Sequence, residues 1–121
     1  QLSVDVVQAV RRHDMVDQVV ISSFNPFALR AAKRAGPEIE CGLLLAHDLP
    51  AWMRHELTRR ISLAGALHPD VPMVDEAYMK RARRLKLPVR VWTVNEDQDM
   101  RRMIALGVDT IITDVPYHLK E

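Results

Sequence analysis

Five short apolar runs recur along the chain at similar intervals. Most are rich in β-branched residues, and their starts are about 20–25 residues apart, the length of a strand, a loop and a helix. Short, nearly continuous apolar runs are typical of strands in a parallel sheet that helices cover. The predicted strands are Val19–Ile21, Gly42–Leu45, Leu63–Leu67, Val89–Val94 and Thr110–Thr113.

Helical patterns fill the segments between these runs. A first helix is predicted over Val4–Arg12, before the first strand. A second begins at Asn25-Pro26, because Asn is a favoured N-cap and Pro fits the first helical position. The pair Gly36-Pro37 ends it. A third helix is expected to start from a cap on Asp48.

The remaining helices follow from capping signals and from apolar residues at helical spacing. Asn95 is predicted to begin the last helix, with Gln98 placed as in a capping box. The middle two helices are predicted from apolar faces formed by Met53, Leu57 and Ile61 and by Val74, Tyr78, Ala82 and Leu85.

The resulting order αβαβαβαβαβ implies a parallel sheet with right-handed crossovers. Two folds satisfy it. Five strands in about 120 residues suit a flavodoxin-like doubly wound sheet. The same units also suit an arc of a (β/α)8 TIM barrel, which needs about 250 residues to close. In either fold, ligands bind at the carboxyl ends of the strands. That edge would carry Ser22, Ser23, Phe24, Asn25, His47, His68, Trp92, Thr93, Asn95, Thr113 and Asp114.

Length and composition fit one soluble globular domain over residues 1–121. Hydrophobic residues make up 48% and charged residues 27%, which excludes a disordered chain. No apolar run approaches the roughly 20 residues that span a bilayer, and no signal-peptide pattern opens the chain. The first residue is Gln1 rather than Met, so we expect a piece of a longer protein.

The net charge and the cysteine content narrow the range of expected binding partners and cellular locations. A net charge of +1 argues against a nucleic-acid partner, because such proteins usually gather a basic excess on one face. The dense basic run between Lys80 and Lys86 is better explained as a solvated helix face. The lone cysteine, Cys41, cannot form an internal disulfide and is expected to be a small buried residue. A chain without disulfides is compatible with a cytoplasmic location.

Candidate metal ligands are scattered. The spacings His-x-His, Cys-x-x-Cys and His-Glu-x-x-His are missing from the sequence, as are a Gly-rich phosphate loop and a Gly-x-Ser-x-Gly elbow. His13 and His55 fall on helical segments, whereas His47 and His68 follow strands and could face a site. A hydrogen-bonded loop histidine is the simpler interpretation of both. The fifth histidine is His118.

Three groups at the carboxyl edge have two interpretations each. Ser22-Ser23 could supply a nucleophile or a phosphate contact, or could be a polar strand end that leads into the Asn25 cap. Trp92 could belong to the core or could form the wall of a ligand site. Asp114 could be a general base or part of a turn before Pro116. The residues alone leave all three open.

Four stretches of the chain resemble, in order, the C-terminal part of the glycerophosphodiester phosphodiesterase family. The segment from Val91 to Asn95 contains the family's WTVN, and residues 107–116 resemble its closing strand, GVDGIITDxP. Residues 20–26 resemble a strand-to-helix segment ending in Ser-Phe, and residues 67–69 resemble the segment after a later strand. The resemblance extends over nearly the whole chain.

The resemblance implies a (β/α)8 barrel that hydrolyses glycerophosphodiesters to glycerol 3-phosphate and an alcohol with a divalent cation, Mg or Ca. This chain would supply strands four to eight. The family's first three strands carry its His-Arg-Gly motif, its Glu-x-Asp pair, its second catalytic histidine and its Glu-x-Lys strand. None of these has a counterpart here, so no catalytic or metal-binding residue is carried over. We therefore expect the 121-residue chain to be inactive by itself.

The same resemblance places Trp92 and Phe24 against the glycerol or alcohol moiety, with Ser23 and Asn95 adding polar contacts or shaping the loops. A five-strand arc has two open edges and an exposed apolar inner face, so we expect it to form a two-fold homodimer. The alternative function is a non-catalytic ligand-binding or interaction domain that is stable by itself.

Overall fold

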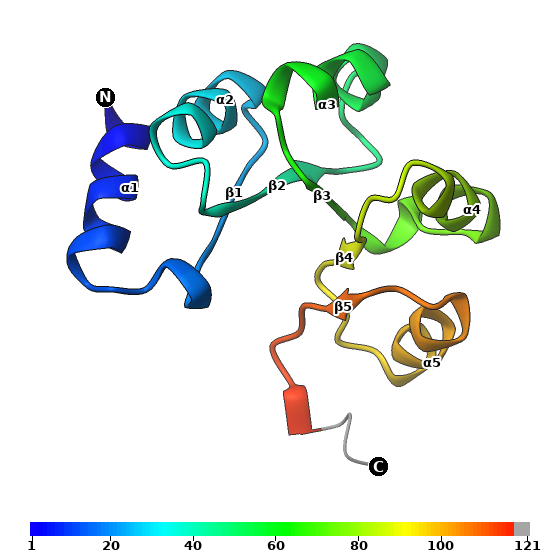
Figure 1. The fold of residues 1–121 in the computed structure, drawn as a ribbon. Coiled ribbons are helices and arrows are strands. Elements are labelled where there is room, and N and C mark those ends of the chain that lie inside the picture. The colour runs from blue at the N-terminus through cyan, green and yellow to red at the C-terminus, as the bar shows by residue number, and fades with distance from the viewer. Residues whose placement is uncertain (118–121) are drawn as a thin grey trace.

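The computed structural model describes residues 1–117, so His118 lies outside the described residues. It contains five strand–helix units in the predicted order (Figure 1). The strands are β1 (Val20–Ser23), β2 (Glu40–Leu45), β3 (Ala66–Pro69), β4 (Arg90–Val91) and β5 (Thr110–Ile111). The α-helices are α1 (Leu2–Arg12), α2 (Pro26–Ala35), α3 (Glu56–Ser62), α4 (Glu76–Arg84) and α5 (Asp97–Leu106), and the 3-10 helices are η1 (Val16–Gln18), η2 (Ala51–Arg54) and η3 (Val71–Met73).

All strand pairs are parallel, and the strands lie in the order in which they occur in the sequence. β1, β2 and β3 form one ladder, and β4 pairs with β5. Two isolated parallel bridges, Leu67 to Val89 and Asp70 to Trp92, join β3 to β4. This sequential order confirms the barrel arc and excludes the flavodoxin-like alternative, whose strand order reverses at a switch point.

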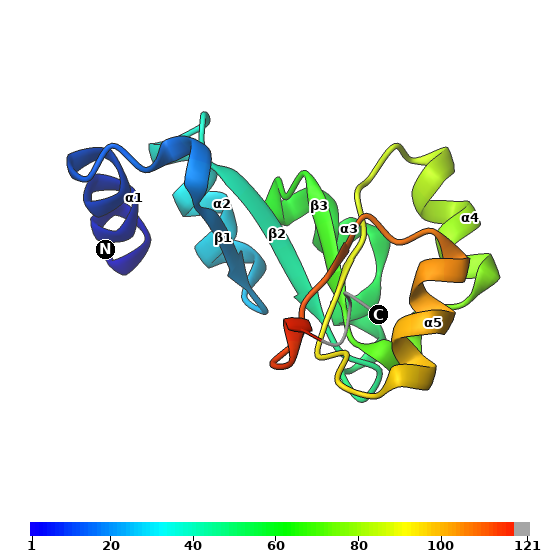
Figure 2. The ribbon, with the colours of Figure 1, turned by 90° about the horizontal axis from the view of Figure 1, so that it is seen from below.

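The helices lie on one side of the curved row of strands. Figure 1 shows them side by side around the outside of the arc, and Figure 2 shows the strands running alongside one another from below. The hydrophobic core fills the space between this outer layer and the sheet, and the opposite, inner face of the strands is left without a helical cover. The largest fully buried side chains include Leu29, Ile39, Leu43, Met79, Met103, Val89 and Val91.

Side-chain caps begin the second and fourth helices where the sequence supplies them. The Asn25 side chain accepts hydrogen bonds from the backbone N–H groups of Phe27 (2.9 Å) and Ala28 (3.3 Å), which confirms the predicted cap. Asp75 accepts one from the Tyr78 N–H at 2.7 Å and so begins α4. These contacts satisfy N–H groups that have no partner within a helix.

Two predicted helix starts are wrong. Asp48 does not begin α3: the 3-10 helix η2 intervenes, and His55 is the N-cap, its ring nitrogen accepting a bond from the Leu57 N–H at 3.1 Å. Leu57, expected on a buried face, is 59% exposed. Glu96, not Asn95, precedes α5, and the Asn95 side chain is engaged elsewhere.

Three predicted strands are shorter than their apolar runs, and the last of them, β5, covers only Thr110–Ile111 of the predicted Thr110–Thr113. β3 begins at Ala66 because Leu63 ends α3 in the left-handed conformation, with φ of 61°. Leucine rarely adopts that conformation, so a leucine at position 63 did not predict the end of a helix. The ladder of β4 covers only Arg90 and Val91, although the extended chain continues through the bridge at Trp92. The predicted span Val89–Val94 is therefore too long.

Candidate functional site

Side chains from several units meet at the carboxyl edge of the strands. Phe24 follows β1, His47 follows β2, Asp70 follows β3 and Trp92 follows β4. Parallel strands in sequential order bring these positions to one edge, which is where α/β barrels bind their ligands. The edge is built on strands and short loops, so its side chains are held by the core behind them.

The rings of Phe24 and Trp92 contact each other edge to face. Their centroids are 5.9 Å apart and their planes are inclined by 82°. Such T-shaped pairs are a preferred aromatic geometry. Because Phe24 belongs to the first strand unit and Trp92 to the fourth, the contact crosses the inner side of the arc.

The position of Trp92 is fixed by its indole N–H, which donates to the backbone carbonyl of His68 at 2.7 Å. The ring is half-buried, and Phe24 remains 39% exposed. Trp92 is therefore not enclosed by the core, and its ring lies beside an exposed aromatic side chain. That these rings touch a substrate stays a prediction.

Ser23 and Asn95, the other two predicted site residues, make hydrogen bonds to loop residues at the carboxyl edge. The Ser23 hydroxyl accepts a hydrogen bond from the Asn25 N–H at 3.0 Å. Asn95 donates to the Asp114 carboxylate at 3.1 Å, and its carbonyl oxygen accepts from the Thr113 hydroxyl (3.2 Å) and the Asp114 N–H (3.0 Å). Asn95 thus joins the ends of β4 and β5, which favours the loop-shaping role for both residues.

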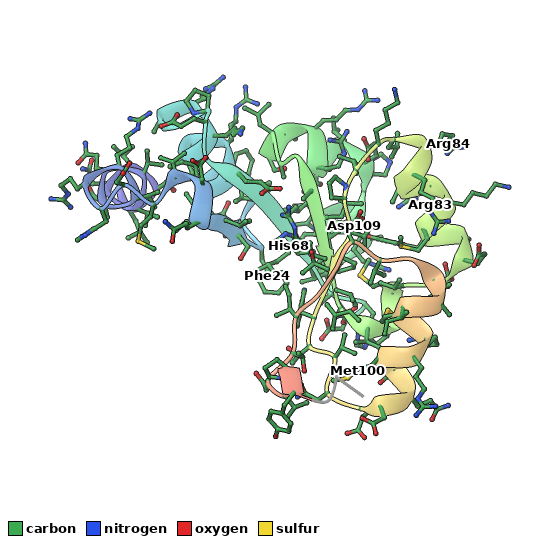
Figure 3. The ribbon with its side chains drawn as sticks, turned by 60° about the horizontal axis from the view of Figure 1, so that its bottom comes forward. Phe24, His68, Arg83, Arg84, Met100 and Asp109 are labelled. Carbon is green, nitrogen blue, oxygen red and sulfur yellow. The ribbon has the colours of Figure 1, made fainter. Side chains whose placement is uncertain are left out.

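A polar cluster lies deeper on the inner face. His68 is 4% exposed, and its ring nitrogen lies 3.2 Å from the Arg90 guanidinium. Arg90 also forms an ion pair with Glu40. Burial, and then the Arg90 charge, lower the pKa of His68 to about 4, so this imidazole is neutral at pH 7. Figure 3 shows Phe24 and His68 on the inner side of the arc, away from α4 and α5.

Gly42 makes room for this histidine. A Cβ atom on Gly42 would overlap the His68 ring on the neighbouring strand. Gly42 lies inside β2, between Cys41 and Leu43, and does not mark a strand end. Its lack of a side chain allows the close approach of the neighbouring strand's histidine. Cys41 is buried, as predicted.

A second polar pair joins the ends of β2 and β3. The buried Asp70 carboxylate accepts hydrogen bonds from the His47 backbone N–H, at 3.2 Å and 3.1 Å, and lies 2.6 Å from the His47 ring nitrogen Nδ1. The hydrogen bond to Asp70 raises the pKa of His47, whose ring is largely exposed. The carboxylate therefore orients the imidazole and favours its protonated form.

Sequence reasoning placed His47 and His68 at the ligand edge but missed the side chains that contact them. Asp70, Arg90 and Glu40 had no local signal, because their partners are contributed by neighbouring strands. One clue was present in the alternation of β3, where His68 and Asp70 are two residues apart and so share a face.

The described residues offer no ready-made metal site. Within residues 1–117, no group of three or more His, Cys, Asp or Glu side chains is placed to hold a metal ion. Over the same residues, no helix is both long and apolar enough to cross a bilayer.

Comparison with known proteins gives one consistent family. The model of the glycerophosphoryl diester phosphodiesterase family matches residues 1–118. A glycerophosphodiester phosphodiesterase of Caldanaerobacter subterraneus is 33% identical over 112 residues, which are 92% of this chain and 44% of that protein.

Two solved structures share the fold. A crystal structure from Silicibacter pomeroyi that carries the same family's name is 30% identical with a TM-score of 0.79, over 93% of this chain and 41% of that one. A phosphodiesterase from Oleispira antarctica superposes with a TM-score of 0.75 at 22% identity, over 98% of this chain and 49% of that one. The chain thus spans less than half the length of these relatives.

Proposed function

The chain belongs to the glycerophosphoryl diester phosphodiesterase family, and we propose that it forms strands four to eight of a barrel that hydrolyses glycerophosphodiesters to glycerol 3-phosphate and an alcohol. The observation that carries this proposal is the Phe24–Trp92 pair at the carboxyl edge of an open arc. The Oleispira antarctica structure is a complex with the product sn-glycerol-3-phosphate, which supports this product class. Such diesters derive from phospholipids, so the reaction belongs to lipid metabolism.

The reaction needs three things that this chain does not bring together. Phosphodiester hydrolysis requires charge neutralisation at the phosphoryl oxygens, an activated nucleophile and a proton for the leaving oxygen. The described residues do not fit a divalent cation, since no three ligands converge. We assign Mg or Ca, and the acid and base, to the strands that complete the barrel, and we derive no step through the metal.

The role of this chain is then to form one wall of the substrate site. Trp92 is held by its bond to the His68 carbonyl, so its ring presents a fixed apolar face beside Phe24. We assign both rings to packing against the glycerol or alcohol moiety. Ser23 and Asn95 support them by fixing the turns that follow β1 and precede α5.

The open face of the arc needs a partner. Val20, Phe24 and Ile112 lie on the inner side and are each about two-fifths exposed, at 41%, 39% and 40%. In the longer protein, three more strands would cover this face and close the barrel. We propose that the 121-residue chain alone covers it by forming a two-fold homodimer.

The test is to assay the longer protein encoded by this gene. It should release glycerol 3-phosphate from glycerophosphocholine when Mg or Ca is supplied, and a chelator should stop the release. Trp92→Ala should raise KM several-fold, whereas Trp52→Ala, which removes an exposed tryptophan of η2 outside the Phe24–Trp92 pair, should leave KM unchanged. A longer reading frame without a His-Arg-Gly motif, or a protein with no such activity, would favour a non-catalytic binding domain.

A further inference from the structure

A groove of about 690 Å³ opens between the η2–α3 segment and helix α4. It exists because α3 is only seven residues long and packs closely against α2, while it contacts α4 little. Both segments belong to the middle of the arc, beside β2 and β3, so additional strands at either edge of the sheet would not reach the groove. Its lining includes His47, Arg54, His55, Asp75, Tyr78 and Arg81.

Two guanidinium groups in the groove are without a carboxylate partner among the described residues. Arg54 donates through Nε to the Leu49 carbonyl at 3.0 Å, which leaves its terminal N–H groups free of that bond. Arg81 lies over the Tyr78 ring, with its central carbon 5.9 Å from the ring centroid. Planar guanidinium groups suit the bidentate recognition of phosphate oxygens.

The acidic side chains of the same groove are already engaged. Glu56 forms ion pairs with Arg59 and Arg60 on its own helix. Asp75 accepts the hydrogen bond that begins α4. Arg54 and Arg81 are therefore paired with neither carboxylate, although Glu56 and Asp75 bring two negative charges to the lining.

The two imidazoles also present donors. The Nδ1 atom of His55 accepts the hydrogen bond from the Leu57 N–H, so its hydrogen is carried by Nε2. The Nδ1 atom of His47 is paired with Asp70, which leaves Nε2 for a ligand. Both rings are exposed.

A buried hydroxyl adds a fifth group. The Tyr78 hydroxyl is enclosed by protein and makes no hydrogen bond with any described residue. Burial raises the pKa of Tyr78, so the group is a neutral donor. The Tyr78 side chain lines both the groove and a narrow cavity of about 20 Å³ that reaches inward to Leu43 and Leu67, and its enclosed hydroxyl meets a ligand only when the side chains around it shift. An unpaired buried hydroxyl destabilises the folded state, so a ligand that accepts its hydrogen would gain affinity.

We propose that this groove binds a phosphate monoester, held by Arg54, Arg81 and the Tyr78 hydroxyl. The two guanidinium groups, the two imidazoles and the Tyr78 hydroxyl of the lining are donors, which suit a ligand whose exposed atoms are acceptors, and a phosphomonoester carries three such oxygens and up to two negative charges. The three residues that hold the ligand lie on η2 and α4 and are separate from the Phe24–Trp92 wall, although His47 at the carboxyl edge of the strands also lines the groove.

The experiment titrates the full chain, at constant ionic strength, with inorganic phosphate and then with glycerol 3-phosphate, while NMR follows the Arg Nε–H and backbone amide signals. Saturable shifts are expected in residues 47–56 and 72–81. The double variant Arg54→Gln, Arg81→Gln should lower the affinity at least tenfold. The matched control is Arg34→Gln, Arg84→Gln, which removes the same charge outside the groove and should bind as the unmodified chain does. Arg84 lies on the outer surface of α4 in Figure 3.

Tyr78→Phe provides a variant that keeps the fold. It removes an unpaired buried hydroxyl, so the free energy of unfolding should stay the same or rise, while phosphate affinity falls roughly threefold to tenfold, the value of one hydrogen bond. A general loss of folding would instead lower stability and affinity together.

A second experiment distinguishes a free phosphate ligand from the headgroup of a lipid. Phosphatidylcholine vesicles with and without phosphatidic acid, which carries a phosphomonoester, are compared in a flotation assay. Binding to free phosphate alone assigns a soluble ligand. Binding only to the phosphatidic acid vesicles, abolished in the double arginine variant, assigns a headgroup. The proposal is overturned if neither probe gives saturable binding, or if the matched control loses as much affinity as the groove variant.

Discussion

The His68 imidazole lies directly over the backbone of Gly42 on the adjacent strand, at the distance where any Cβ atom would overlap the ring. The pair is set by the parallel register, in which Leu44 aligns with His68 and Gly42 with Ala66. The large His68 ring thus fills the space that the missing side chain of Gly42 leaves on the inner face of the sheet. This complementarity gives the first prediction.

Gly42→Ala should destabilise the fold by about 1–3 kcal/mol, the usual effect of overpacking a filled site. The added methyl group would push the His68 ring away from Arg90, which hydrogen-bonds it. Urea denaturation measures the change. The double variant Gly42→Ala, His68→Ala should lose much less stability than the sum of the two single changes. Strict additivity would show that the two residues do not interact.

As the pH is lowered, protonation of His68 should destabilise the protein at a higher pH than protonation of the carboxylates does. The folded pKa of about 4 is below the unfolded value of 6.5, so the unfolded chain binds more protons between these values. Stability should therefore fall as pH is lowered from 6.5 to 4, by up to about 3 kcal/mol, because each pKa unit corresponds to about 1.4 kcal/mol.

The control for this prediction is His68→Gln, which has no titrating side chain. Its free energy of unfolding should vary less with pH between 4.5 and 6.5 than that of the unmodified chain. Glu38 and Glu56, whose pKa values are lowered by arginine neighbours, act below that window. Equal slopes for both proteins would place the sensitivity elsewhere.

The pH dependence of stability that His47 contributes should have the opposite sign to that of His68. Its pKa is raised by Asp70, so the pair stabilises the fold fully below pH 6.5, and this contribution is lost as pH rises through the folded pKa. NMR titration of the His47 ring should give a value above 6.5, and Asp70→Asn should bring it back toward 6.5. An unchanged value in the variant would show that the carboxylate does not control the ring.

Asp70→Asn should also lower the free energy of unfolding by about 1–3 kcal/mol. The buried carboxylate accepts two contacts from the His47 N–H, and an amide nitrogen turned toward that N–H cannot replace them. Chemical denaturation at pH 7 measures the loss. Asp17→Asn, at an exposed carboxylate of η1, is the comparison, and it should have a much smaller effect.

The 121-residue chain alone should not hydrolyse glycerophosphocholine or glycerophosphoethanolamine, even with Mg or Ca supplied. The reason is that no three metal ligands converge within residues 1–117. Enzymatic detection of glycerol 3-phosphate is the measurement. Release above a blank that a chelator abolishes would contradict both the inactivity and the assignment of the metal site to other strands.

The chain alone should sediment or scatter light as a dimer at micromolar concentration. Its open edges are β1 and β5, and its inner face exposes apolar side chains such as Ile112. A contact sufficient for a stable dimer should bury more than roughly 1,000 Å². Ile112→Glu should shift the equilibrium toward monomer, whereas Ile104→Glu on an exposed helix face should not. A stable monomer would contradict the proposed pairing.

The order of elements was predictable because strand and helix periodicity are local. The Asn25 cap was correct for the same reason, since the side chain and the N–H groups it accepts from are two and three residues apart. The alternation of units left two folds open. Only pairing across the sheet, such as β2 with β3, decides between them.

The errors arose where tertiary contacts overrode a local preference. Asparagine is a favoured helix cap, but the side-chain amide of Asn95 instead joins the loops after β4 and β5. Gly42 was correctly predicted to lie in a strand, but the reason that this position has no side chain, the His68 ring on the next strand, left no local signal. The partners of the site residues, such as Asp70 for His47, are 23 positions away in the sequence and left no local signal.

The strand ladders of the arc form two plates, which two bridges between β3 and β4 join. The first consists of β1, β2 and β3, and the second of β4 and β5. The seam between them is crossed by few backbone bonds, among them Trp92 N–H to the Pro69 carbonyl at 3.1 Å. Phe24 belongs to the first plate and Trp92 to the second, so rotation about the seam changes the 5.9 Å separation of their rings. The separation of the two rings therefore depends on the curvature of the barrel wall as well as on their own side-chain torsions.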